Sequence, residues 1–423
     1  MKDMDRIIIF EDVKYKNFLP IAYTMPVFML KHGFLSNLER ITRLFSNRKI
    51  YLLVRDYLAR VTSKETGFSV DIAESEDDAE YKTFINGRLI NPEILVTLLK
   101  QMEDKSEVAI FNDSDLVYLK VRSERVKSNV KKINDLFLKG EIDRIIGTWD
   151  IDIIENKKLE CVNYPWELIY KNSERIMKDY YTLLQHGLIK GMVDSGVYLI
   201  KKENIYIGEG SRVMSGSVIV AEDGPVIVDN GAKVMPNSVI YGPCYIGKKS
   251  LIKAGATIYE GTTIGEVSKV GGEVEESIIH SFSNKQHYGF LGHSYIGRWC
   301  NLGAGTSNSD LKNNYGNIKI QIGNEKIDTG KIFMGMLMGD HSKTAINTSI
   351  NTGSVIGVMC NIFVRDFPDK YVPSFSWVGK TVERYDFDKA IQTARRVMTR
   401  RNKELTDDEV LVLRYIYEES SKE

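Results

Sequence analysis

The chain has 423 residues, 43% of them hydrophobic and 27% charged, and its 57 basic residues balance its 57 acidic residues. This length predicts about two or three domains. Zero net charge gives no field that attracts a polyanion, so we expect no nucleic acid partner. No apolar run reaches the ~18 residues of a membrane span. In the first ten residues, acidic residues precede the first apolar run. We therefore expect a cytoplasmic protein with no membrane segment.

Residues 1 to about 200 alternate strand-like apolar runs with helical patterns. This alternation is typical of an open, mostly parallel α/β sheet. We therefore expect an α/β domain over residues 1–200. The strand-like runs are residues 6–10, 49–54 and 107–111, and the helical patterns are residues 33–45 and 92–102.

From about residue 205, aliphatic residues recur every six positions, without a slip from Val228 to Val270. A six-residue period is the signature of a parallel β-helix, in which each aliphatic side chain points into a prism with three short strands per coil. The side chains expected inside the prism are Ile207, Val213, Ile219, Val228, Val234, Ile240, Ile246, Ile252, Ile258, Ile264, Val270, Phe290, Ile296, Leu302, Ile332, Met338, Thr344, Ile350, Ile356 and Ile362.

After Trp377 the repeats stop and a basic segment follows. Thr406 and Glu409 form a capping box before an apolar-periodic run, which predicts two helices in a tail over residues 379–423. The β-helix would then span residues 201–378. The positive charge of the tail is typical of a solvated helix face or of a subunit contact.

Two stretches interrupt the six-residue period, at residues 270–290 and 306–333. Loops on a rigid scaffold commonly carry binding and catalytic residues. Both stretches flank the coils around residues 290–305, so we expect them to converge on one cleft.

His287 lies in the first of these stretches. A histidine there is suited to take a proton from an attacking amine, and the backbone amides of GAGT (303–306) are suited to stabilise the oxyanion formed from a thioester. A structural hydrogen bond in a turn is the alternative role for His287. The groups suited to bind a phosphate are Lys285, Lys312 and Lys319, and those suited to bind sugar hydroxyls are Asn301, Asn313, Asn314 and Tyr315.

The hexads, together with SNKQHYGFLGHSY, NLGAGTSNSDLKNNY and MGDHSKTAINT, resemble the acetyltransferase half of the bifunctional GlmU family. That family acetylates glucosamine 1-phosphate and then couples it to UTP. A divergent GlmU-like group, known as sugar-phosphate nucleotidyltransferases, is more similar still, because the three motifs recur there nearly unchanged. The resemblance implies a left-handed parallel β-helix and a homotrimer with the CoA groove between neighbouring prisms.

The resemblance also implies that His287 is the catalytic base of an acetyl-CoA-dependent N-acetylation of an amino-sugar 1-phosphate. Phe290 replaces a tyrosine of GlmU, which removes a hydroxyl from the sugar site. His341 is a second site candidate, with a structural turn as the alternative. The other implied contacts are those of Asn301 and Ala304 with the amino-sugar and acetyl-CoA groove, of Asn314 and Tyr315 with the sugar, and of Lys319 with its phosphate.

The N-terminal stretch resembles the nucleotidyltransferase domain of the same family but lacks its glycine-rich phosphate loop. Arg88 stands where the family has a Mg²⁺-binding aspartate, and an arginine cannot ligate a metal. Three roles remain open: nucleotidyl transfer from UTP or dTTP, binding of a sugar nucleotide without turnover, and a structural cap on the β-helix. The residues considered for a rearranged active site are Asp12, Lys31 and Arg88, with Mg²⁺ held by carboxylates such as Asp113 or Asp115.

We therefore expect an α/β nucleotidyltransferase-like (Rossmann-like) domain, a left-handed parallel β-helix and C-terminal helices. The expected function is that of a GlmU-like transferase acting on a small sugar phosphate. The alternatives are a nucleotidyltransferase with a structural β-helix, and a non-catalytic scaffold that binds sugar nucleotides.

Overall fold

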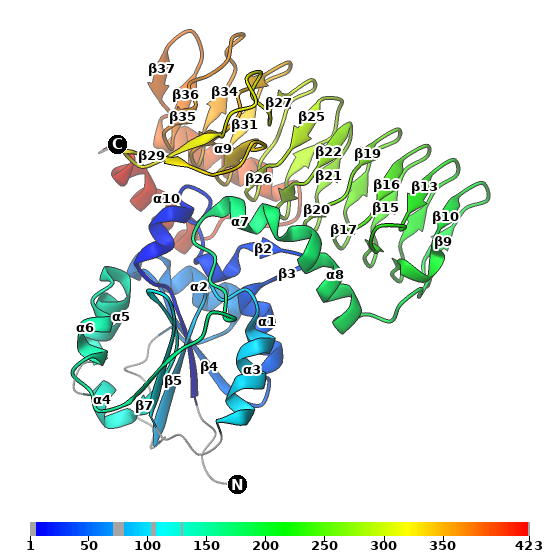
Figure 1. Ribbon diagram of the computed structural model, residues 1–423. Helices are drawn as coiled ribbons and strands as arrows, with labels where there is room; N and C mark the ends of the chain where they lie inside the picture. The colour runs from blue at the N-terminus through cyan, green and yellow to red at the C-terminus, as the bar shows by residue number, and fades with distance from the viewer. Residues whose placement is uncertain (1–5, 71–79, 103–106, 128–129, 422–423) are drawn as a thin grey trace. The chain divides into compact units, whose positions relative to one another are not determined.

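The computed structural model describes residues 6–70, 80–102, 107–127 and 130–421, and Figure 1 shows its elements. The chain forms two compact units. The N-terminal unit comprises Met1–Phe18, Thr24–Leu30 and Ser36–Asn163. The β-helix unit comprises Leu19–Tyr23, Lys31–Leu35 and Tyr164–Glu423.

A six-stranded mixed sheet, in the order β4-β1-β5-β7-β6-β8, forms the centre of the N-terminal unit. The pairs β1–β4, β1–β5 and β6–β8 are parallel, and β7 is antiparallel to both of its neighbours. The strands are β1 (Arg6–Phe10), β4 (Lys49–Leu53), β5 (Tyr81–Asn86), β6 (Val108–Asn112), β7 (Asp115–Arg122) and β8 (Asp152–Glu155). The helices are α1 (Asn37–Leu44), α2 (Ala59–Thr66), α3 (Pro92–Gln101), α4 (Ser123–Lys127), α5 (Val130–Lys139) and α6 (Ile142–Ile146).

The expected strands appear as β1, β4 and β6, and the expected helices as α1 and α3, so the α/β prediction is confirmed. All five residues of β1 are buried, as expected of a parallel strand covered on both faces. The sequence patterns did not single out β7, in which polar and apolar residues are mixed.

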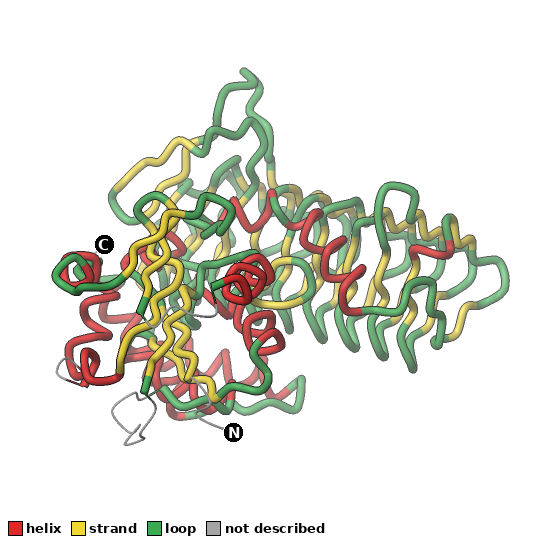
Figure 2. The backbone as a smooth tube through the Cα atoms, turned by 60° about the horizontal axis from the view of Figure 1, so that its bottom comes forward, coloured by secondary structure: helices red, strands yellow, loops and turns green. Residues whose placement is uncertain are grey.

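The β-helix unit is a prism with three walls of short parallel strands, which run in rows along its length (Figure 2). The first wall contains β11 (Ile205–Ile207), β14 (Val226–Val228), β17 (Cys244–Ile246), β20 (Thr262–Ile264), β23 (Ile278–Ile279), β26 (Tyr295–Ile296), β30 (Met336–Met338), β33 (Ser354–Ile356) and β35 (Tyr371–Val372).

The second wall has a gap between β24 and β31, where Asn301 forms isolated bridges to both strands. It contains β9 (Met192–Val193), β12 (Arg212–Val213), β15 (Lys233–Val234), β18 (Leu251–Ile252), β21 (Lys269–Val270), β24 (Asn284–Lys285), β31 (Lys343–Thr344), β34 (Asn361–Ile362) and β36 (Ser376–Val378), with β37 (Val382–Arg384) antiparallel at its end. The third wall contains β10 (Tyr198–Ile200), β13 (Val218–Val220), β16 (Val239–Tyr241), β19 (Thr257–Ile258), β22 (Glu273–Glu275), β25 (Phe290–Gly292), β27 (Ser307–Asn308) and β32 (Ser349–Ile350).

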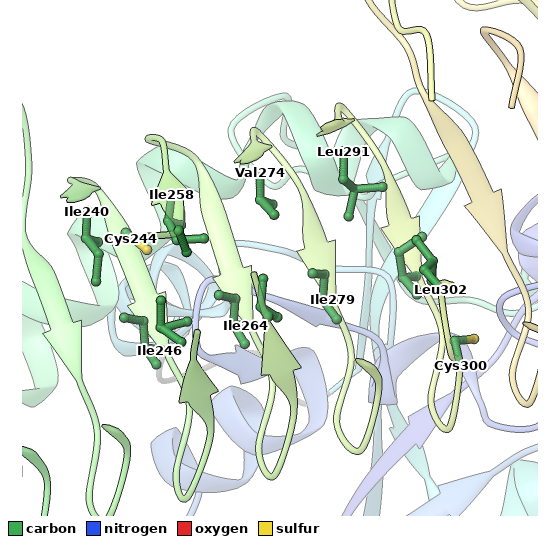
Figure 3. Close-up of a cluster of buried hydrophobic side chains, with 14 of the residues drawn as sticks. Ile240, Cys244, Ile246, Ile258, Ile264, Val274, Ile279, Leu291, Cys300 and Leu302 are labelled. Carbon is green, nitrogen blue, oxygen red and sulfur yellow. The ribbon is translucent and has the colours of Figure 1, made fainter. Parts of the chain in front are cut away.

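The interior of the prism is a continuous column of aliphatic side chains (Figure 3). The expected interior residues lie in this core, with Thr344 also buried, except at two positions. Leu291 replaces Phe290 in the core, and Ile332 is 44% exposed. Both residues lie six positions before a core residue, Ile296 and Met338, but the step from Leu291 to Ile296 is five residues, and Ile332 belongs to the segment that precedes β30.

Residues 270–290 are not an insertion, contrary to our expectation. They form regular coils through β22, β23 and β24, which pair with the coils before them. The interior residues here are Val270, Val274 and Ile279, so the steps are four and five residues. Shorter corners therefore break the six-residue period without breaking the β-helix.

Residues 306–333 do contain an insertion, which leaves the third wall after β27 and returns to the first wall at β30. An antiparallel hairpin of β28 (Lys319–Ile322) and β29 (Glu325–Asp328) forms its centre. Leu311 pairs with Phe333 at its base. Lys312 donates a hydrogen bond to the carbonyl of Asn317 within the same loop.

Two helices precede the first coil and two follow the last. The strands β9 and β10 already belong to the prism and precede residue 201, the predicted start of the β-helix. Thr406 and Glu409 form the expected capping box. None of the helices in the described part of the chain is long and apolar enough to cross a membrane. The helices of this unit are α7 (Pro165–Tyr170), α8 (Asn172–Leu183), α9 (Phe387–Thr399) and α10 (Asp407–Glu419).

Candidate functional site

His287 lies at the corner between the second and third walls, in the turn that joins β24 to β25. Its side chain is exposed, and its ring makes no hydrogen bond with any described residue. The backbone of the turn is fixed, because the His287 carbonyl accepts a hydrogen bond from Lys285 Nζ at 3.1 Å. A side chain at Gly289 would collide with the carbonyl of Thr306. The imidazole is therefore available to a ligand at the surface.

The GAGT motif forms the corner of the next coil, directly against the turn of His287. The Gly305 amide donates to the Tyr288 carbonyl at 3.0 Å. The amides of Gly303 and Thr306 also donate to backbone carbonyls. Among the described residues, the Ala304 N–H is the one amide of the four without a hydrogen-bond partner. Ala304 is therefore the residue of this motif whose N–H can stabilise an oxyanion.

Lys285 occupies an interior position of the prism. It pairs with Val270 of the preceding coil and is only 2% exposed. Its Nζ donates to the carbonyls of Gly271 at 2.8 Å and His287 at 3.1 Å. Burial lowers the pKa of this ammonium group to about 8. Lys285 therefore holds the turn of His287 from inside and is not a surface ligand for a phosphate, which corrects the expected role.

The remaining candidates from the GlmU resemblance are exposed and lie on two sides of the prism. Asn301 is on the outer face of the second wall. Asn314 and Tyr315 lie in the insertion, where Tyr315 is 70% exposed, and Lys319 begins β28. The structure thus brings His287 and Ala304 to one corner. It places the insertion residues at the opposite corner of the third wall.

His341 lies at the remaining corner, between the first and second walls. Its ring is buried and stacks on Trp299, with the ring centroids 6.2 Å apart. Its Nδ1 has no hydrogen-bond partner among the described residues. Burial lowers the pKa of the imidazole well below its usual range, so the ring is neutral at physiological pH. His341 does not share the corner of His287, and its φ of 62° is that of a tight turn.

A closed ion-pair network lies at the carboxyl ends of β1 and β5 in the N-terminal unit. Arg88 is 1% exposed, and its Nη2 lies 2.6 Å from Asp12 Oδ2 and 2.7 Å from Asp115 Oδ1. Its Nη1 donates to the Val162 carbonyl at 2.6 Å. Lys14 Nζ lies 2.7 Å from Asp115 Oδ1. Arg88 and Lys14 thus neutralise the two aspartates.

This network does not fit the Mg²⁺ that we had considered for the N-terminal unit. Burial alone would raise the pKa of Asp12, but the charge and hydrogen bonds of Arg88 lower it. The Arg88 guanidinium therefore supplies the positive charge that a metal ion would bring. Asp113 is exposed and lies 3.6 Å from Lys157. Within the described ranges, no three His, Cys, Asp or Glu side chains are arranged to hold a metal ion.

Lys31, in β2 (Lys31–His32), belongs to the β-helix unit. Its backbone N–H and carbonyl both hydrogen-bond to the Tyr295 hydroxyl, at 3.0 and 3.2 Å. Its ammonium group lies 3.9 Å from Glu266. Lys31 thus belongs to the β-helix unit, whereas Asp12 and Arg88 belong to the N-terminal unit.

Sequence reasoning missed two groups. Lys14 completes the network around Arg88, and His293 lies with its Nδ1 2.8 Å from Asp310 Oδ2. The second pair joins residues that are seventeen positions apart on successive coils. Only the coil geometry brings them together, so no local spacing could have indicated the pair.

Comparison with known proteins defines the class of the chain. Residues 7–187 match the family model described as sugar nucleotidyl transferase. Residues 225–260 match the model described as bacterial transferase hexapeptide (six repeats). The chain therefore joins a sugar nucleotidyltransferase-family domain to a hexapeptide-repeat β-helix, and both matches support a transferase.

The relatives are GlmU-like proteins, and they confirm the expected resemblance to that family. The bifunctional protein GlmU of Methanococcus aeolicus is 24% identical over 84% of this chain and 92% of its own length. That of Methanocaldococcus jannaschii is 26% identical over 75% and 79%. A bifunctional sugar-1-phosphate nucleotidylyltransferase/acetyltransferase of Sulfurisphaera tokodaii is 33% identical over 39% and 40%.

Proposed function

We propose that the β-helix unit transfers an acetyl group from acetyl-CoA to the amine of an amino-sugar 1-phosphate. The observation that carries this proposal is the corner where both the exposed His287 imidazole and the Ala304 N–H lie, each without a hydrogen-bond partner among the described residues. Attack on a thioester needs a proton acceptor and an oxyanion donor. The relationship to proteins named as acetyltransferases supports the same reaction.

In the proposed step the amine nitrogen attacks the thioester carbonyl carbon, and His287 takes the proton that the nitrogen loses. The Ala304 N–H stabilises the negative oxygen of the tetrahedral intermediate. The C–S bond then breaks, and the thiolate recovers the proton from His287. Asn314, Tyr315 and Lys319 would bind the sugar phosphate from the insertion.

The test incubates the protein with acetyl-CoA and a panel of amino-sugar 1-phosphates and follows the free thiol. The variant His287→Ala should lower the rate by on the order of 10² to 10⁴. His186→Ala is the matched control, because His186 is exposed and stacks only on nearby tyrosines. Unchanged turnover in His287→Ala would refute the role of His287 as the base.

For the N-terminal unit we propose binding of a sugar nucleotide without metal-dependent turnover. The match of residues 7–187 supports the ligand class, and the pairing of Arg88 with two aspartates argues against a metal site. The protein should release no pyrophosphate from UTP or dTTP and a sugar 1-phosphate, yet a sugar nucleotide should raise its Tm. Pyrophosphate release that EDTA abolishes would instead favour a working nucleotidyltransferase.

We also propose that the chain acts as a cytoplasmic homotrimer, as the GlmU resemblance implies. Analytical ultracentrifugation tests the assembly directly. A mass near three times the 48.2 kDa of one chain is expected, and a monomer at the assay concentration would exclude a shared CoA groove.

A further inference from the structure

The outer face of the second wall carries a lysine beside an asparagine in the middle of the prism. Val270 lies in the core, so Lys269, the residue before it in β21, points outward. Lys269 pairs with Asn284 of β24, whose neighbour Lys285 is the buried, inward residue. The side chains of Lys269 and Asn284 therefore lie next to each other, on strands that are about 4.8 Å apart.

The C-terminal tail brings two arginines to the same place. Arg400 caps the carboxyl end of α9, and Arg401 follows it. The Nη2 of Arg401 donates a hydrogen bond to Asn284 Oδ1 at 3.0 Å. The guanidinium group of the tail thus lies against the amide of Asn284, one strand away from Lys269. Residues more than one hundred positions apart in the sequence meet on one surface.

A fourth cation lies on the preceding coil. Lys253 follows β18, the strand that pairs with β21 on the side away from Asn284. A Cβ added at Gly271 would lie 2.9 Å from the Cβ of Lys253. Because Gly271 is two residues after Lys269, Lys253 extends the cluster toward the corner between the second and third walls.

No carboxylate offsets these four charges. Within the described ranges, none of the four side chains forms an ion pair. Burial lowers the pKa of Lys269, and the three neighbouring cations lower it further. Burial and the charge of Arg400 also lower the pKa of Arg401. The fold therefore brings like charges together, which costs free energy unless an anion lies among them.

The polar groups of the cluster are hydrogen-bond donors that lack acceptors. Arg401 occupies Asn284 Oδ1, which leaves the Nδ2 amino group of Asn284 without an acceptor among the described residues. The buried Nε of Arg401 also has no partner in the described part of the chain. A phosphate group fits such a set, because its oxygens accept hydrogen bonds and its two negative charges offset the cations.

We propose that Lys269, Asn284 and Arg401 form a binding site for a phosphate group, with Arg400 and Lys253 adding positive charge around it. The phosphate is either the free inorganic ion or part of a small phosphate ester, since both present the same dianion. It joins the tail to the second wall, because Arg401 comes from the tail and Lys269 from a strand. This inference does not depend on the proposed acetyl transfer.

The first experiment follows the Tm of the full chain as inorganic phosphate is added in Tris buffer, with sodium chloride keeping the ionic strength constant. Phosphate should raise the Tm of the wild type. Lys269→Met keeps the apolar stem and removes the charge, so it should bind phosphate about tenfold more weakly. Lys233→Met is the matched control, because Lys233 is exposed and points outward from the same wall two coils earlier.

Two variants test the repulsion in the absence of phosphate. Lys269→Met should raise the Tm by more than Lys233→Met does, because Lys269 lies among like charges. Asn284→Asp places a carboxylate inside the cluster, so it should raise the Tm and abolish the response to phosphate. A lower Tm in both Lys269→Met and Asn284→Asp would show that the protein already compensates these charges, and would overturn the proposal.

The response to phosphate itself has two contrary outcomes. One is that phosphate leaves the Tm of the wild type unchanged. The other is that phosphate raises the Tm of the wild type, Lys269→Met and Lys233→Met equally, which is the effect of a salt that is excluded from the whole protein surface. Either result would overturn the site.

Calorimetric titration identifies the source of the phosphate group. Glucosamine 1-phosphate that binds the wild type more tightly than inorganic phosphate does, and loses affinity in Lys269→Met, would assign the site to a phosphate ester. Tighter binding of inorganic phosphate, lost in the same variant, would assign it to the free ion. Affinities for both ligands that are unchanged in Lys269→Met would overturn the assignment of Lys269.

Discussion

In the N-terminal unit Arg88 lies between Asp12 and Asp115, whereas on the β-helix His287 faces solvent with no partner among the described residues. The first arrangement pairs the aspartates with the side chains of Arg88 and Lys14, so their charges are neutralised without a metal ion. The second leaves a reactive group at the surface, on a turn fixed from inside by Lys285. Polar residues at the carboxyl ends of strands can therefore be structural. A single exposed imidazole on a rigid corner is the better candidate for a catalytic residue.

Replacing Arg88 with alanine should have the largest effect on the closed network. Without the guanidinium, the Asp12 and Asp115 carboxylates would be buried without their main counter-charge, so we expect the free energy of unfolding of the N-terminal unit to fall by about 3–5 kcal/mol. Calorimetry measures this change. Lys157→Ala, which removes an exposed pair with Asp113, is the control and should cost less than about 1 kcal/mol. Similar losses in the two variants would show that the network is not stabilising.

Arg88→Asp should convert the closed network into a metal site. Three carboxylates would then face one another, and Mn²⁺ at one hundred times its Kd should stabilise the variant by about 2.7 kcal/mol. The additional change Asp12→Asn should remove most of this gain. Thermal shifts with and without Mn²⁺ provide the measurement. The contrary result is that Mn²⁺ stabilises the wild type and that Asp12→Asn alone abolishes this stabilisation. The Arg88 guanidinium would then not take the place of a metal ion.

In the β-helix unit, the buried Lys285 should make the free energy of unfolding depend on pH. Its pKa is about 8 in the folded protein, against 10.5 for an ordinary lysine. Between these values the folded state binds fewer protons than the unfolded state, so stability rises with pH by up to about 1.4 kcal/mol per unit. Lys285→Met should remove this contribution, while Lys319→Met, at an exposed position, should retain it. Parallel stability curves for the two variants would contradict the burial of the charge.

Tyr288→Phe should have the smallest effect. The Tyr288 hydroxyl donates to Asn347 Oδ1 at 3.1 Å, and the Tyr288 side chain is 66% exposed. Loss of this bond should change the stability of the β-helix by no more than about 0.5 kcal/mol. Urea denaturation measures the difference. A cost above about 1.5 kcal/mol would mean that the corner of His287 is a packed structural element and not an open site.

The sequence predicted the β-helix well because one aliphatic side chain per strand must point inward in every regular coil. The prediction failed where corners shorten, between Val270 and Ile279, because a fixed period cannot follow steps of four and five residues. It failed again at Lys285, since a lysine at an interior position has the same sequence spacing as one at the surface. Its burial depends on the two carbonyls that accept hydrogen bonds from its ammonium group.

The candidate site was less predictable than the fold. The sequence indicated His287 and the GAGT motif, but the backbone hydrogen bonds of the folded coils decide which of the four amides, that of Ala304, has no partner in the described part of the chain. The sequence also argued against Arg88 as a metal ligand, because an arginine cannot ligate a metal. Its burial between two aspartates required the sheet, which brings residues 12, 88 and 115 to one edge.

The bridge between Leu311 and Phe333 has a consequence for the evolution of this protein. A loop whose ends are already held together can change length at an entropic cost that grows only logarithmically. The segment between these residues is therefore separable from the scaffold, and selection can lengthen, shorten or exchange it while the coils keep their register. Relatives with the same prism can in this way diverge in the small molecules they recognise.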